Sequence, residues 1–82
     1  MTPEQARAAR AMLNLTQPRV AELAGVGLST VVDLEKTRRA VAPATVDAIR
    51  AALEAAGVEF TNGDAPGVRL KRQSAPETGG SA

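Results

Sequence analysis

The chain has 82 residues and a formal net charge of +1, with ten Lys and Arg against nine Asp and Glu; it can form one small domain, and its overall charge does not by itself require a nucleic-acid partner. Because it contains neither cysteine nor histidine, disulfides, thiolate or imidazole metal sites and histidine-dependent catalytic triads are excluded. No paired-carboxylate or phosphate-loop motif, signal peptide or membrane span is visible, so we expect a cytoplasmic protein that is not an enzyme and has no cofactor, metal, small-molecule ligand or membrane partner.

The first helix is expected to begin at Pro3 and to run to about Leu13. Thr2 can serve as its N-cap, Pro3 suits the first helical position, and Gln5 can complete a capping box with Thr2. Apolar residues recur at helical spacing along this segment, at Ala6, Ala9, Met12 and Leu13.

Two further helices are expected around a tight turn. Thr16 is the second N-cap, and Pro18 is tolerated in the first turn because its missing N–H would have no partner there. Gly25 is suited to end this helix in a left-handed conformation. The third helix is expected from about Leu28 to Lys36.

A fourth helix follows residues 37–42, and after it the sequence changes from helix-forming to β-prone. Residues 37–42 read as a loop, either Pro43 or Thr45 opens the helix, and Gly57 ends it. The segments 58–60 and 68–70 are short and β-prone, and turn-forming residues separate them. We therefore divide the chain into a helical domain (1–57), a strand extension (58–72) and a disordered tail (73–82).

The spacing of residues 17–36 predicts a helix-turn-helix. Ala21 is small where two helices would cross, and Gly25 allows the positive φ that the turn needs. Apolar residues stand where a core is required, at Val20, Ala24, Val26, Val31 and Leu34.

The segment LNLTQPRVAELAGVGLSTVVDLEKTRR resembles the phage-repressor (Cro/CI, or XRE) family of helix-turn-helix DNA-binding domains, through Leu13, Leu15, Gln17 and Glu35. The resemblance covers residues 2 to about 57, and the C-terminal part is similar to the small single-domain members common in α-proteobacteria. It implies an all-α dominated, four- to five-helix lambda-repressor-like domain with a short C-terminal β-hairpin or strand extension.

The resemblance also implies a role for individual residues. The third helix would face the DNA bases with Leu28, Ser29, Thr30 and Asp33. The phosphates would be contacted by Gln17, Lys36, Arg38 and Arg39. Arg10 and Glu35 would form a buried structural ion pair. Two departures from the family pattern are Gly27, where Ser or Thr is usual at the N-cap, and Thr37, where Gly commonly follows the helix.

These features predict a sequence-specific regulator that binds double-stranded DNA, as a dimeric repressor on a palindromic operator. The base-facing residues include no Arg, Asn or Gln, so DNA shape and dimer spacing are expected to supply part of the specificity. The alternative function is a protein-binding module such as an antiactivator or antitoxin, and a regulatory protein partner stays open. The strand extension either caps its own core or forms the dimer, with Val58, Phe60, Val68 and Leu70 as interface candidates.

Overall fold

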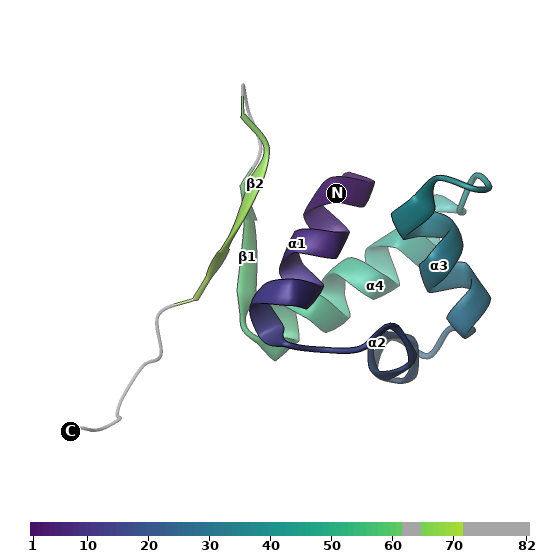
Figure 1. Ribbon diagram of the computed structural model, residues 1–82, viewed down its shortest axis with the longest axis horizontal. Helices are drawn as coiled ribbons and strands as arrows, with labels where there is room; N and C mark the ends of the chain where they lie inside the picture. Colours follow the sequence, from purple (N-terminus) through teal and green to yellow (C-terminus); the bar gives the residue numbers. More distant parts are fainter. Residues whose placement is uncertain (62–64, 72–82) are drawn as a thin grey trace.

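The computed structural model describes residues 1–61 and 65–71 and contains four helices followed by a two-stranded hairpin (Figure 1). The elements are α1 (Pro3–Leu13), α2 (Gln17–Ala24), α3 (Leu28–Lys36), α4 (Pro43–Ala56), β1 (Val58–Thr61) and β2 (Gly67–Leu70). The predicted mostly helical fold with a C-terminal hairpin is therefore confirmed. The predicted disordered tail, residues 73–82, lies outside the described residues.

The helix ends follow from local chemistry. The Thr2 hydroxyl accepts from the Gln5 N–H at 3.0 Å and the Thr2 N–H donates to Gln5 Oε1 at 2.7 Å, which completes the capping box of α1. The Thr16 hydroxyl caps α2 by accepting from the Arg19 N–H at 3.2 Å. Gly25 ends α2 with φ 71°, a conformation that glycine adopts without a steric penalty.

The core consists of small and branched aliphatic side chains from every helix and from β1. Ile49 and Leu53 of α4 are its largest fully buried members. Ala9 and Ala21 are small enough for the helices to approach closely, which compensates for the near absence of aromatic residues. The whole buried set comprises Ala6, Ala9, Val20, Ala21, Val31, Leu34, Ile49, Leu53 and Val58.

The hairpin turns its apolar face toward its own helices. Antiparallel pairing sets Val58 opposite Leu70 and Phe60 opposite Val68, so these four side chains share one face. Val58 is fully buried in the core, and Phe60 and Val68 pack against that core. Of the four candidates for a dimer interface, Val58 has no surface to offer a partner, because it is fully buried within its own chain. Leu70 is the member that stays largely accessible, with 55% of its surface exposed.

The opposite face of the hairpin is polar. Arg69 Nε donates to Glu59 Oε1 at 2.7 Å, directly across the strand pair. This hydrogen bond, with the charge of Arg69, lowers the pKa of the Glu59 carboxyl. Because both side chains are exposed, the pair fixes the strand register more than it stabilises the domain.

Gln5 fastens the hairpin to α1. Its side chain is buried, and its Nε2 donates to the carbonyl oxygens of Thr61 and Gly67, each at 3.0 Å. The same side chain accepts from Thr2 through Oε1. One side-chain amide thus takes part in the cap of α1 and binds both strands where they meet the hairpin turn. This gives an otherwise marginal two-stranded hairpin a buried attachment.

We expect Gln5→Glu to lower the free energy of unfolding by about 2 kcal/mol. The carboxylate can still accept from the Thr2 N–H. At neutral pH, however, its second oxygen carries no proton, so it repels the two carbonyl oxygens to which the amide donated. Urea unfolding followed by circular dichroism measures the loss. Thr2→Ala is the control, since it removes the cap alone and should cost about 1 kcal/mol. Equal losses in both variants would show that the contact with the hairpin adds nothing.

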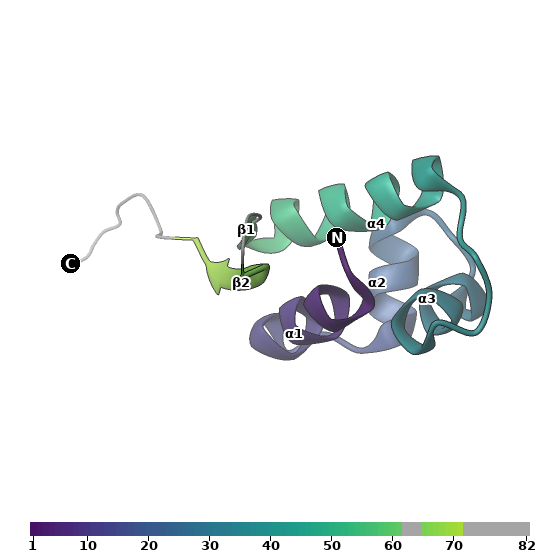
Figure 2. The ribbon, with the colours of Figure 1, turned by 90° about the horizontal axis from the view of Figure 1, so that it is seen from above.

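The hairpin and α3 lie at opposite ends of the molecule. In both views, α1 and α4 stand between them (Figures 1 and 2). β2 contacts α1, and β1 contacts α4 and α1. Changes at the hairpin are therefore separated from the face that α3 presents.

Candidate nucleic-acid interface

α2 and α3 are joined by a short turn that fixes the angle between them. Beyond Gly25, the Val26 N–H donates to the Ala21 carbonyl oxygen at 3.0 Å, so the turn closes back on α2. Val26 packs against the core. Gly27 is the N-cap of α3 and supplies no side-chain hydrogen bond, as the sequence indicated. The first turn of α3 therefore receives no hydrogen bond from an N-cap side chain.

The outward side of α3 is partly apolar. Leu28 is 45% exposed, Ser29 and Lys36 are exposed, and Val32 is half-buried. The inward side carries Val31, Leu34 and Glu35, which are all buried. Of the four predicted base-facing residues, Leu28 and Ser29 are thus the ones that lie fully on the surface.

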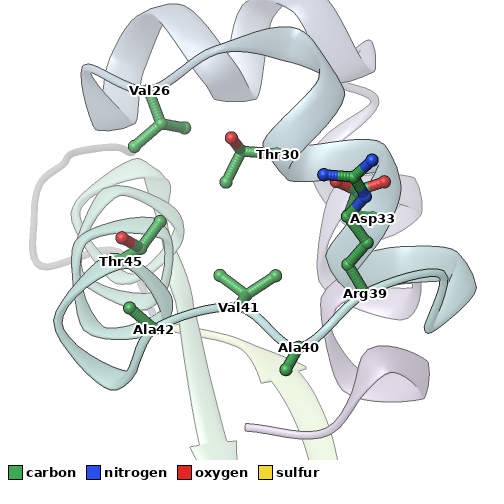
Figure 3. Close-up of a pocket in the computed structure, with 8 residues that line it drawn as sticks. All are labelled: Val26, Thr30, Asp33, Arg39, Ala40, Val41, Ala42 and Thr45. Carbon is green, nitrogen blue, oxygen red and sulfur yellow. The ribbon is translucent and has the colours of Figure 1, made fainter.

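Thr30 and Asp33 are turned toward a pocket instead. The pocket has a volume of about 340 Å³ and lies between α3, the loop after it and the start of α4 (Figure 3). Asp33 is only 19% exposed, and Arg39 lines the same pocket from the loop side. The remaining lining residues are Val26, Ala40, Val41, Ala42 and Thr45. The family resemblance implies an outward Asp33, but it does not give the position of the loop after α3.

The loop after α3 holds two exposed arginines close to the helix. The Arg38 N–H donates to the Asp33 carbonyl oxygen at 3.0 Å, and Arg38 Nε lies 3.9 Å from Asp33 Oδ1. Arg38, Arg39 and Lys36 are all exposed. Three cations therefore stand at the C-terminal end of α3, accompanied by one carboxylate that faces Arg38.

Thr37 ends α3 in a left-handed conformation, with φ 55°. A β-branched residue is strained in this region, at a cost of order 1 kcal/mol or more, whereas glycine is not. We expect Thr37→Gly to raise the free energy of unfolding by about 1 kcal/mol, which corresponds to a melting temperature roughly 4–8 °C higher. Differential scanning calorimetry measures this shift. Thr37→Ala retains a Cβ in the same conformation, and a similar gain in that variant would contradict the explanation by strain.

A polar network around the buried Glu35 attaches the end of α3 to α1 and α2. Arg10 donates to Glu35 through Nε (2.9 Å, to Oε2) and through Nη2 (3.0 Å, to Oε1), and Gln17 Nε2 donates to Oε1 at 3.1 Å. Arg10 Nη1 also donates to the Leu15 carbonyl oxygen at 3.2 Å. Arg7 adds a hydrogen bond to the Glu35 backbone carbonyl. The expected ion pair between Arg10 and Glu35 is present, and it is bidentate.

Gln17, which was expected to contact phosphate from the surface, also takes part in the network around Glu35. It begins α2 and is half-buried, with one amide hydrogen given to Glu35. An amide nitrogen carries two hydrogens, so the second is still available to an outside acceptor. The part played by Arg7, Gln17 and Leu15 in the network was absent from the sequence prediction, because it depends on how three helices meet.

Among residues 1–61 and 65–71, no three Asp or Glu side chains come together as a metal site, and no helix has the length and apolarity to cross a membrane. Residues 7–59 match a protein-family model described as helix-turn-helix. No curated protein matches the chain. The matched residues include α2, the turn, α3 and the network around Glu35 that holds α3 in place.

Proposed function

Because the chain belongs to the XRE family of helix-turn-helix domains, a family of DNA-binding transcription regulators, we propose that it is a sequence-specific repressor that binds a palindromic operator as a homodimer. The observation that supports this best is the surface of α3: an exposed helix face that ends beside Lys36, Arg38 and Arg39. Such a face fits the major groove while the cations reach the flanking phosphates. In a bacterial cell, such a repressor would act in the cytoplasm, where the chromosome lies.

In the proposed complex, Leu28 and Ser29 contact base edges, and Thr30 and Asp33 approach them from the rim of the pocket. Gln17 gives its second amide hydrogen to a phosphate at the start of α2, where the positive end of the helix dipole also favours an anion. The rigid network around Glu35 supports this proposal, since it fixes α3 relative to α2 before DNA is bound.

The homodimer is proposed because a palindromic site needs two copies of α3. At the hairpin, the Lys71 N–H donates to the Gly57 carbonyl oxygen at 2.8 Å, so alternation along β2 directs the backbone groups of Val68 and Leu70 away from β1. These groups and the exposed Leu70 side chain are available to a second copy of the strand extension.

We expect Leu70→Lys to shift the full-length chain toward monomer in sedimentation equilibrium, while its circular dichroism spectrum stays unchanged. Arg69→Lys keeps the charge of the neighbouring outward position and serves as the control. If the wild type sediments as a dimer and Leu70→Lys does so with the same dissociation constant, the dimer is formed elsewhere.

Selection of bound duplexes from a random DNA pool, followed by sequencing, tests the proposed function. A repressor of this kind enriches an inverted repeat, and its binding constant falls log-linearly with salt. An enriched sequence without two-fold symmetry would refute the palindromic operator. If no sequence is enriched and binding to duplex DNA is negligible at low salt, the DNA-binding function is refuted, which favours the protein-binding alternative.

A further inference from the structure

Val32 is a half-buried apolar side chain on α3 that lies outside the hydrophobic core of the domain. Over the described residues, 1–61 and 65–71, it belongs neither to the buried core nor to the partly buried residues packed against that core. A β-branched residue is also an unfavourable choice for an outward helix position, where packing does not compensate its low helix propensity. The core therefore does not account for this residue, and the exposed part of it can meet a partner.

Val32 continues a row that begins at Leu28. The two residues are four positions apart, so they are neighbours on one side of the helix. Leu28 is 45% exposed and also has no place in the core. Lys36 follows at the next position of the same row. The outward side of α3 thus has an apolar strip that ends at a cation, while Thr30 and Asp33 lie beside it at the pocket.

We infer that Leu28 and Val32 determine the DNA sequence preference of this protein by contacting the 5-methyl groups of thymines in the major groove. This inference rests on the proposed function. Neither side chain can donate or accept a hydrogen bond, so neither can distinguish bases by their polar edges. Thymine is the one standard base that presents a methyl group in the major groove.

Charge favours DNA over a protein as the occupant of this strip. Lys36, Arg38 and Arg39 are exposed at one end of it, and they complement the phosphates that border a major groove. An apolar protein partner would have no need of three cations at the rim. The strip is also short, which suits the contact of one or two methyl groups in each half-site.

The test replaces thymidine with deoxyuridine, which lacks the 5-methyl group and keeps the same hydrogen-bonding edge. A duplex recovered from the random pool is altered one thymidine at a time, and binding is measured by fluorescence anisotropy. For the wild-type protein, we expect about fourfold weaker binding at each thymidine whose methyl group is contacted. Leu28→Ala and Val32→Ala should each abolish this difference at one position and retain it at the other.

Leu23→Ala is the matched control, because Leu23 is 44% exposed but lies on α2. This variant should keep the full set of methyl effects. Equal wild-type affinity for every deoxyuridine duplex would overturn the inference and leave the proposed function intact. Methyl effects that persist in both Leu28→Ala and Val32→Ala would also overturn it. If no DNA sequence is preferred at all, the proposed function fails, and the inference fails with it.

Discussion

Arg10→Ala is expected to lower the free energy of unfolding by about 3–5 kcal/mol, because the carboxylate that it leaves without its partner is almost fully buried. The substitution leaves the almost fully buried Glu35 carboxylate with Gln17 as its remaining side-chain donor. For a domain of this size, the melting temperature should fall by roughly 12 °C or more. Thermal unfolding followed by circular dichroism measures the effect.

Arg19→Ala is the control for this experiment. Arg19 also pairs with a glutamate, Glu22, but both side chains are more than half exposed, so the loss should stay below about 1 kcal/mol. The double substitution Arg10→Met with Glu35→Met should recover a large part of the loss, because no buried charge then remains unpaired. A loss for Arg10→Ala no larger than that for Arg19→Ala would contradict the structural role of the pair.

Replacing both Arg38 and Arg39 by alanine is expected to weaken DNA binding about 100-fold, since each arginine would lose a charge-assisted hydrogen bond to a phosphate. The loss should be similar on all sequences, because phosphates carry no sequence information. The slope of log K against log salt should fall by about 1.8, or 0.9 for each contact. Arg39→Ala should have the larger single effect, since Arg38 already faces Asp33.

The control removes the same charge from elements other than α3 and the loop that follows it. Arg50 belongs to α4 and lies over the Phe60 ring, and Arg69 belongs to β2. Replacing both by alanine changes the net charge equally but should leave the salt slope nearly unaltered. Anisotropy titrations between 50 and 200 mM salt, roughly the range over which such contacts are lost, separate the two outcomes. An equal slope change in both double variants would indicate a general charge effect and no local contact.

The helices could be predicted from the sequence because each of their ends depends on a few adjacent residues. Thr2, Thr16 and Gly25 act in the structure as the local rules expect. Glycine at position 57 likewise ends α4. Capping and turn chemistry are contained within four or five residues of chain, so a sequence without a structure is sufficient to find them.

What the sequence could not provide depends on contacts between distant segments. Gln5 reads as half of a capping box, and its second role as a donor to Thr61 and Gly67 has no local signal. The family resemblance implies an outward Asp33, but its side chain is only 19% exposed and lines a pocket together with Arg39. Val32 lies between Val31 and Leu34 in the sequence, so it cannot be distinguished from a core residue until the burial of each side chain is known.

The attachment of the hairpin through Gln5 has a consequence for synthesis of the protein. Its donor and the Gly67 acceptor are 62 positions apart, so the first helix is made long before the strand it holds. At about 5–20 residues per second, the ribosome needs roughly 3–12 s to cover that distance. During this interval the Gln5 amide has no hairpin to bind, because its acceptor at Gly67 has not yet been made. The domain is therefore completed only when its C-terminal strand emerges, and a chain interrupted before Gly67 should be open to proteases at its N-terminal helix.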